Sequence, residues 1–238
     1  MHRIVSLVPS ITELLFYLGL GSCIVGRTKF CIHPKECVDQ VTKIGGTKKI
    51  RIDVIRTLKP DLIIANKEEN EAEQIRTLAN EFNILLTHVK DYEGALAMIA
   101  RIGKITSTLE EANRLMSEIE NKFTSLEKAN KSCIYLIWRD PYMTVGGDTY
   151  IHSMLEKCGF KNLLGQEMRY PVITLERIKE LQPDEVFLSS EPYPFQAIHV
   201  ESLIEALPAS KVRLVDGEMW SWYGNRMLAL PDYVKGLV

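Results

Sequence analysis

Aromatic side chains follow the β-branched stretches of this sequence, at positions where a ligand pocket would form. Trp138 comes directly after one such stretch, and Trp220 and Trp222 come shortly after the last one; these are all of its tryptophans. Polar groups such as Arg139 and Arg226 stand beside them. Aromatic walls with a few polar anchors are typical of a pocket for a planar or bulky ligand, and parallel sheets bind ligands beyond the carboxyl ends of their strands. The pattern therefore favours ligand contact over the ordinary core role of a lone tryptophan.

Signals for catalysis are weak. The sequence has no Gly-x-Ser-x-Gly motif, and its five histidines are scattered. The glycines at 146–147 follow a turn, and those in 19–21 end a predicted helix, so neither pair fits a phosphate-binding loop. Cys31, His33 and Cys37 offer soft ligands, but the fourth ligand of a zinc site is missing. We therefore expect no catalytic residue, no metal site and no intrinsic cofactor.

Composition limits the class of protein and its partners. The chain has 238 residues, of which 46% are hydrophobic and 25% charged, which is typical of a folded, soluble protein. Its net charge of -2 gives no global positive field, so nucleic acid is not an expected partner. No stretch approaches the roughly 18 apolar residues of a membrane helix. The five cysteines form no disulfide framework, which indicates reduced thiols.

The start of the chain bears on its location. The apolar stretch 4–8 ends at Pro9, whereas a secretory signal needs a longer uninterrupted apolar segment and a cleavage site. No signal peptide is recognisable, so a cytoplasmic location stands as an alternative to export.

Short β-branched runs alternate with helical stretches, which predicts an α/β fold with parallel sheets and crossover helices. Ser10 is predicted to cap the first helix and Gly19 to end it. The predicted strands are 4–8, 61–65, 84–89, 133–138, 185–188 and 212–215. The predicted helices are 10–18, 52–58, 71–82, 151–157 and 175–181.

An internal repeat indicates two duplicated lobes. The stretch 55–65 ends in Pro60-Asp61 followed by a strand, and 178–188 repeats the same order around Pro183-Asp184. A second repeat relates the predicted helix and following glycine of 11–26 to those of 151–165. A single helix-Pro-Asp-strand junction is common in α/β proteins, but two in the same order favour duplication.

The stretch 92–129 lies between the two halves. Its apolar residues recur mostly every three or four positions, and it contains no proline, which predicts one long helix. The expected organisation is an N-terminal α/β lobe over 1–91, a linking backbone helix over 92–130 and a C-terminal α/β lobe over 131–238. Such a helix would hold the lobes in a nearly fixed relation.

Four stretches resemble the substrate-binding proteins of ABC transporters that have a helical backbone and bind vitamin B12, haem or iron siderophores, the vitamin B12 binders most of all. They are RIVSLVPSITEL at 3–14, LKPDLIIA at 58–65, YPVITLE at 170–176 and SWYGNR at 221–226. The resemblance covers essentially the whole chain. It implies two Rossmann-like lobes joined by one long helix, a ligand held in the cleft between them, no catalysis, and a periplasmic or cell-surface location.

The resemblance also assigns residues. Phe30, Trp138 and Tyr170 match ring-contacting aromatics, and Glu218 matches an acid of the C-terminal pocket loop. Thr47 and Asn66 stand where tryptophans are expected. The predicted ligand-binding residues, from the strand-end positions and the resemblance together, are Pro9, Ser10, Phe30, Asn66, Trp138, Arg139, Tyr170, Glu218, Trp220, Trp222, Tyr223 and Arg226.

Asp53 and Glu176 are the expected docking residues for the membrane permease. They are separated along the chain by the same number of positions as the two Pro-Asp motifs, so the repeat places one acid on each lobe. Complementing a helix dipole is the simpler role for each carboxylate. The resemblance implies instead that each faces an arginine of a two-fold symmetric permease.

Two functions follow. The first is capture of a cobalamin, a haem or a ferric siderophore by a monomeric binding protein of an ABC importer. The alternative is a cytosolic enzyme or chelatase-like protein on the same frame, using Glu191, Glu218 and Arg226 as acid, base or anion contacts.

Overall fold

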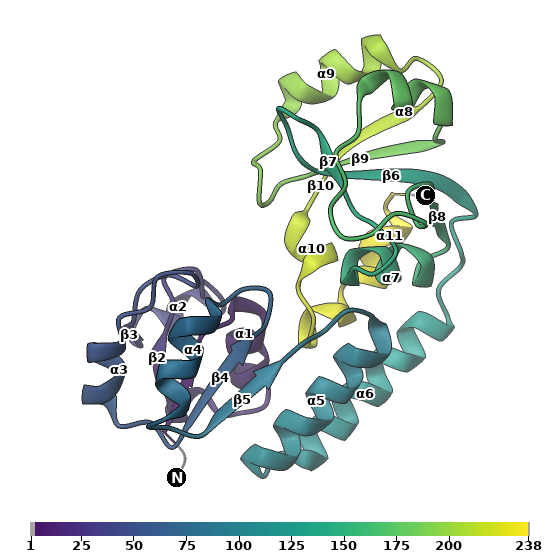
Figure 1. Cartoon of the computed structure of the whole chain (residues 1–238). Coiled ribbons are helices and arrows are strands. Elements are labelled where there is room, and N and C mark those ends of the chain that lie inside the picture. Colours follow the sequence, from purple (N-terminus) through teal and green to yellow (C-terminus); the bar gives the residue numbers. More distant parts are fainter. Residues whose placement is uncertain (1–2, 238) are drawn as a thin grey trace. The chain divides into compact units, whose positions relative to one another are not determined.

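The computed structural model describes residues 3–237, which form two compact units (Figure 1). Unit 1 comprises Met1–Val89, Gly94–Glu118 and Trp222–Arg226, and unit 2 comprises Lys90–Glu93, Ile119–Ser221 and Met227–Val238. The chain thus passes between the units several times. The short C-terminal segment Trp222–Arg226 belongs to unit 1, although the strand before it belongs to unit 2.

The sheet of unit 1 has five parallel strands in the order β3-β2-β1-β4-β5, which confirms the predicted parallel arrangement. The strands are β1 (Ile4–Ser6), β2 (Ile24–Arg27), β3 (Thr42–Lys43), β4 (Leu62–Asn66) and β5 (Ile84–Thr87). The central strands β1 and β4 are buried throughout, as expected when helices cover both faces of a sheet.

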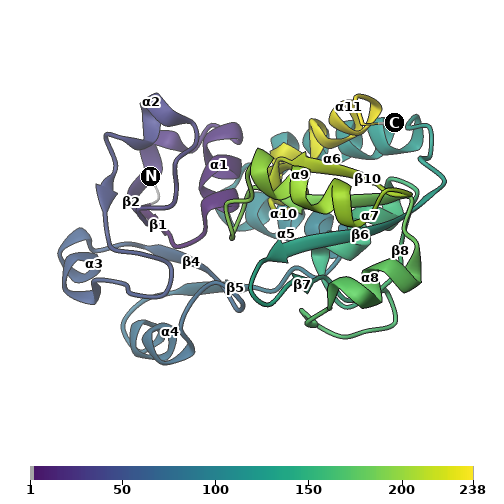
Figure 2. The ribbon, with the colours of Figure 1, turned by 90° about the horizontal axis from the view of Figure 1, so that it is seen from above.

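Helices lie on both faces of this sheet (Figure 2). They are α1 (Pro9–Tyr17), α2 (Lys35–Val38), α3 (Ile52–Leu58) and α4 (Ala72–Ala79), with a 3₁₀ turn, η1, at Gly21–Cys23. Ile55 of α3 and Leu78 of α4 pack with Val5 and Ile63 of the strands in one buried cluster. Alternate strand residues supply this face because side chains alternate along a strand.

The predicted start of the first helix is wrong by one residue, and Ser10 is not its cap. Helix α1 begins at Pro9, and Val8 occupies the capping position without a side-chain hydrogen bond. Proline fits the first helical position because its φ is already helical and it lacks an N–H that would need a partner. Gly19 does lie beyond the helix end, with φ of 77°.

The prediction of one long helix over 92–129 is also wrong. The stretch forms two helices, α5 (Tyr92–Thr106) and α6 (Leu109–Thr124), which lie side by side in Figure 1. Ser107 between them has a left-handed φ of 60°. A Cβ on Gly103 would lie 2.5 Å from the Cβ of Ala112, so this glycine permits the close approach of the two helices. Residues 94–118 of this hairpin belong to unit 1, whereas the sequence predicted a linker separate from both lobes.

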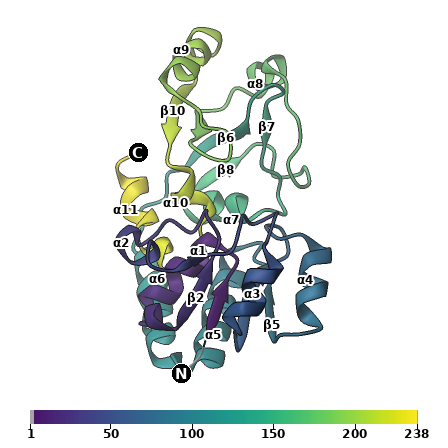
Figure 3. The ribbon, with the colours of Figure 1, turned by 90° about the vertical axis from the view of Figure 1, so that its left-hand side faces the viewer.

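Unit 2 repeats the same architecture. Its strands are β6 (Lys131–Trp138), β7 (Met143–Thr144), β8 (Phe160–Asn162), β9 (Glu185–Ser189) and β10 (Lys211–Val215). Its helices are α7 (Tyr150–Lys157), α8 (Leu175–Leu181), α9 (Ala197–Ala206), α10 (Gly217–Ser221) and α11 (Leu230–Lys235). A 3₁₀ turn, η2, at Asn225–Leu228 begins in unit 1 and ends in unit 2. Helices α8 and α9 cover one face of the sheet, and α7 and α10 lie on the other (Figure 3).

The strand orders confirm the predicted repeat. Strands β8-β6-β9-β10 of unit 2 follow the same spatial and chain order as β2-β1-β4-β5 of unit 1, and all of these pairs are parallel. Strand β7 is the exception to the predicted parallel sheets, since it runs antiparallel to the end of β6.

The two Pro-Asp junctions share their atomic detail. The helix before each proline ends on a left-handed residue, Lys59 with φ of 45° and Gln182 with φ of 46°. Asp61 then accepts a hydrogen bond from the backbone N–H of Arg3 at 2.9 Å, and Asp184 accepts one from the backbone N–H of Ser132 at 2.7 Å. Asp61 thereby ties the start of β4 to the residue before β1. Asp184 ties the start of β9 to the start of β6.

Candidate functional site

Phe30 lies in the loop after β2, at the carboxyl edge of the unit 1 sheet. Its ring is 49% exposed, and the Lys29 Nζ lies 4.9 Å from the ring centre. The ring is also near the backbone of Gly46, where an added Cβ would lie 3.4 Å from it. The loop therefore presents a half-exposed aromatic ring with a cation beside it, and the predicted ring contact of Phe30 stays a prediction.

Asn66, at the end of β4, is buried and fully engaged within unit 1. Its side-chain oxygen accepts the backbone N–H groups of Glu68 and Glu69, and its Nδ2 donates to the Thr87 hydroxyl at 3.2 Å and to the Tyr223 hydroxyl at 2.9 Å. An amide that already uses its oxygen and nitrogen has little left to offer a ligand. These hydrogen bonds give Asn66 and Tyr223 a positioning role within unit 1, and their predicted ligand contact stays a prediction.

The segment Trp222–Arg226 is fixed in unit 1 by its side chains. Trp222 is 8% exposed, with its ring edge-on to His33 at 5.6 Å. The Arg226 guanidinium lies 4.8 Å from the centre of the Trp222 ring and forms two hydrogen bonds to Glu13 of α1, at 2.9 and 3.1 Å. These contacts anchor the segment, and the predicted ligand contact of Trp222 and Arg226 stays a prediction.

Unit 2 exposes Trp138 at the end of β6. Its ring is 41% exposed and meets Tyr193 edge-on at 5.6 Å. The next residue, Arg139, is half-exposed, and a hydrogen bond to Tyr193 holds the pKa of its guanidinium above the usual value. The structure therefore joins Trp138 and Arg139 through one tyrosine, which the sequence placed after β9 but did not include in the site.

Tyr170 and Glu218 are half-buried in other parts of unit 2. The Arg169 guanidinium lies 5.4 Å from the centre of the Tyr170 ring, and the backbone around it is fixed by the Gly146 N–H, which donates to the Arg169 carbonyl at 2.8 Å. Glu218 stands in the first turn of α10, where its N–H donates to Asp216 at 2.9 Å. Both side chains keep exposed surface.

The prediction that Trp220 contacts the ligand is wrong. Its side chain is fully buried in unit 2, stacked on Phe187 at 6.0 Å and edge-on to Tyr135 and Phe160. A ring without exposed surface belongs to the core, and these aromatic contacts account for its place there.

Pro9 and Ser10 begin α1 directly after β1. Both are buried, and Ser10 is 4% exposed. The two acids expected to dock a permease, Asp53 and Glu176, lie each in the second position of its helix, α3 and α8, and both are exposed.

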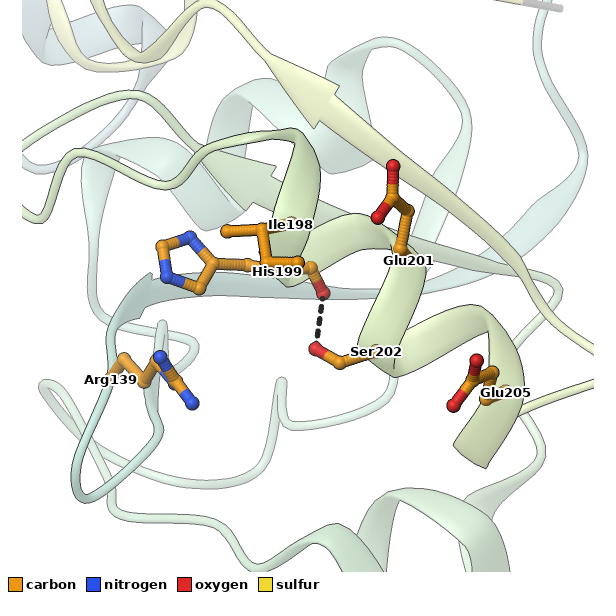
Figure 4. A pocket seen from close by; sticks show the side chains of 6 residues that line it. All are labelled: Arg139, Ile198, His199, Glu201, Ser202 and Glu205. Carbon is orange, nitrogen blue, oxygen red and sulfur yellow. Dashed lines mark hydrogen bonds between the residues drawn. The ribbon is translucent and has the colours of Figure 1, made fainter.

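A cavity of about 310 Å³ lies over α9 in unit 2 (Figure 4). Arg139 faces it from the end of β6, and the other lining residues are Ile198, His199, Glu201, Ser202 and Glu205 of α9. This lining is mostly charged and polar. It therefore lacks the aromatic walls that the sequence predicted and shares only Arg139 with the predicted site.

The cysteine and histidine cluster near Cys31 forms no metal centre in the structure. Cys31 is buried, its sulfur accepts a hydrogen bond from the Thr12 hydroxyl at 3.0 Å, and burial raises the pKa of its thiol. Over residues 3–237, no three His, Cys, Asp or Glu side chains group as metal ligands. In the same range, no helix is long and apolar enough to cross a membrane.

Sequence reasoning missed the partners of the site residues: Lys29, Glu13, His33 and Tyr193. Lys29 adjoins Phe30 in sequence, and Tyr193 follows a strand, so both carried a local signal. Glu13 and His33 carried none, because Arg226 and Trp222 reach them from the far end of the chain.

Comparison with known proteins agrees with the fold. The profile of a family described as periplasmic binding protein matches residues 4–211. An ABC transporter substrate-binding lipoprotein of Bacillus subtilis is 27% identical, over 95% of this chain and 76% of its own length. A vitamin B12-binding protein of Vibrio vulnificus is 27% identical, over 89% of this chain and 79% of its own. The crystal structure of the periplasmic haem-binding protein HutB of Vibrio cholerae matches with a TM-score of 0.82 and 19% identity, covering 99% of this chain and 98% of its own.

Proposed function

Because this chain belongs to the periplasmic binding protein family, we propose that it captures a planar or bulky metal chelate, of the cobalamin, haem or ferric-siderophore type, and delivers it to an ABC-type permease. The family consists of binding proteins rather than enzymes. Export or attachment to the cell surface, as in the lipoprotein relative, and a monomeric state are part of this proposal.

The observation that carries the proposal is the exposure of large apolar side chains in loops that follow the strands. Phe30 and Ile32 are 49% and 46% exposed in the loop after β2. In unit 2, Trp138 is 41% exposed, and Val172, two residues after Tyr170, is 60% exposed. Exposed apolar side chains that lie close together, such as Phe30 and Ile32 of one loop, commonly mark a binding site. We assign Phe30, Trp138 and Tyr170 to the rings of the ligand, with Arg139 and Glu218 as polar contacts.

Titration with haemin, cyanocobalamin and a ferric siderophore, followed by tryptophan fluorescence, tests the proposal. One of these probes should bind at one equivalent, and Trp138→Ala should weaken it by about 1 to 3 kcal/mol through lost apolar burial and stacking. Tyr17 is the matched control, because it is equally exposed at 41% but lies at the far end of α1. Tyr17→Ala should leave the affinity unchanged. Equal affinity of Trp138→Ala and the unaltered protein would remove Trp138 from the site.

The same titration separates binding from catalysis. A binding protein returns its ligand chemically unchanged, whereas an enzyme converts an excess. Of the residues offered for an enzyme, Arg226 is held by Glu13 in an ion pair, which leaves Glu191 and Glu218 for that alternative.

Permease docking is the second part of the proposal. The exposed carboxylates of Asp53 and Glu176 stand at equivalent places of the two repeats, one on each unit. Charge pairs across an interface chiefly set the encounter rate and the register of the complex. Asp53→Lys with Glu176→Lys should abolish docking to the cognate permease and keep the ligand affinity. The control variant, Glu73→Lys with Glu205→Lys, makes the same charge change at other exposed positions and should dock normally. Normal docking of the Asp53→Lys, Glu176→Lys variant would refute the assignment.

A further inference from the structure

The N-terminus of α1 carries hydrogen-bond donors that no described residue accepts. Pro9 supplies no N–H, and the first backbone N–H that finds an acceptor is that of Thr12, which donates to the Val8 carbonyl at 2.9 Å. Within residues 3–237, the N–H groups of Ser10 and Ile11 have no such partner. A helix of nine residues leaves these groups oriented along its axis, where they favour negative charge.

The Ser10 side chain adds an independent observation. It is 4% exposed, yet its hydroxyl has no partner in the described part of the chain. The Thr12 hydroxyl of the same helix, in contrast, donates to the Val8 carbonyl at 2.9 Å. Since Cα–Cβ bonds tilt toward the N-terminus of a helix, the Ser10 side chain leans toward the unpaired N–H groups. The side-chain atoms of residues 3–237 that are both enclosed and unpaired are Trp220 Nε1 and Asn225 Oδ1, so the unpaired Ser10 hydroxyl keeps some exposed surface.

The repeat shows what is missing at this place. Helix α7 of unit 2, the counterpart of α1, begins after Thr149, whose hydroxyl oxygen accepts the His152 N–H at 3.3 Å. The corresponding position before α1 is Val8, which has no side-chain oxygen. The chain itself therefore supplies a side-chain acceptor to the first turn of α7 and none to that of α1.

The charges carried by α1 itself do not oppose an anion. The first turn of α1 contains no acidic residue. The acid further along the helix, Glu13, is occupied by Arg226 through two hydrogen bonds. The sulfur of Cys31 accepts a hydrogen bond from Thr12, which ties the loop that carries Lys29 to this helix.

We propose that the N-terminus of α1 binds an anionic oxygen group of the ligand, a carboxylate or a phosphate. The Ser10 hydroxyl donates to its oxygens, and the unpaired N–H groups of Ser10 and of the fully buried Ile11 favour the negative charge from behind, as helix N-termini do for anions in other proteins. This inference rests on the proposed function and narrows the ligand to a chelate that carries an acidic group.

The anion site is tested without the chelate. Acetate and inorganic phosphate are titrated into ¹⁵N-labelled protein, and the two anions distinguish a carboxylate site from a phosphate site. The amides of Ser10 and Ile11 should shift and saturate with one of them, while the capped amide of His152 should not. Ser10→Ala should lower the affinity for the anion about tenfold, as expected for loss of a hydrogen bond to a charged group. The control Ser22→Ala, at an exposed position, should leave the affinity unchanged.

Val8→Thr offers a second variant, because it supplies the hydroxyl that Thr149 provides in α7. It should compete with the anion and reduce the shifts. Absence of a saturable shift at Ser10 and Ile11 with both anions would overturn the inference.

Matched ligands then connect the site to the proposed function. Haemin is compared with its dimethyl ester, which lacks free carboxylates, and cyanocobalamin with cobinamide, which lacks the nucleotide phosphate. The acidic member should bind more tightly, and Ser10→Ala should reduce that difference. Equal affinities within a pair that binds would count against the inference. If neither pair binds but the amide shifts persist, the proposed ligand class fails and the anion site stands.

Discussion

Replacing Arg226 by methionine removes the charge that faces Glu13 and keeps much of the apolar stem. The two side chains are 11% and 18% exposed, and two hydrogen bonds of 2.9 and 3.1 Å join them. Removing one partner of a nearly buried pair leaves a charge without its counterion, at a cost of about 3 kcal/mol. The lost contact with the face of Trp222 contributes about 1 kcal/mol of this.

The double variant separates the pair from its surroundings. Glu13→Gln with Arg226→Met leaves no unpaired charge, so it should be about 1 to 2 kcal/mol more stable than Arg226→Met alone. The coupling energy of the cycle, to which the cost of Glu13→Gln alone also contributes, is expected to be about 2 kcal/mol. Because the pair is mostly buried, raising the salt concentration to about 1 M should change this energy little.

Urea unfolding followed by tryptophan fluorescence and circular dichroism measures the four proteins of the cycle. A coupling energy below about 0.5 kcal/mol would show that solvent screens the pair as it does at a surface. Ligand affinity gives the second test. If Arg226→Met loses ligand and the double variant does not recover it, Arg226 contacts the ligand as the sequence predicted, and the structural role argued above is refuted.

Two further predictions concern the fold. Gly103→Ala would place a Cβ 2.5 Å from that of Ala112, so it should lower stability by about 1 to 3 kcal/mol despite the better helix propensity of alanine. Ala112→Gly in the same chain should restore the stability. Equal thermal unfolding of Gly103→Ala and the unaltered protein would contradict this packing. The Ser132 hydroxyl and N–H hold the pKa of the Asp184 carboxyl below its usual value, so its contribution to stability is present above about pH 4 and is lost as the pH falls through the lowered pKa. Asp184→Asn should lack that acid-dependent part of the stability, and urea midpoints between about pH 5 and pH 2 that fall equally in both proteins would show that the carboxylate does not hold the strand.

The duplicated junctions were predictable because their determinants are local. A left-handed residue, a proline and an aspartate occur in the same order in both halves, and each residue acts on the backbone near it. The distant contacts of each aspartate are with the start of a strand that the β-branched pattern had already located.

The hairpin of α5 and α6 shows how an apolar pattern can mislead. Each helix buries a face with the same spacing of three or four, so the pattern continues across the turn without a break. The signal that distinguishes two helices is short: Thr108 stands three residues before Glu111, the pattern of a capping box. Gly103 gave a second signal, since its lack of a side chain matters only where another helix approaches.

For the site, the sequence determined which segments follow the carboxyl ends of the strands, because strand periodicity and chain order depend on neighbouring residues. The tertiary structure decided which of those side chains remain exposed. Asn66 meets Tyr223 across 157 positions and Arg226 meets Glu13 across 213, and Trp220 is enclosed by aromatic residues of three strands. Burial and pairing depend on residues that are distant in sequence and close only after folding, so Phe30 and Trp138 are exposed, whereas Asn66 and Trp220 are buried and Arg226 is paired with Glu13.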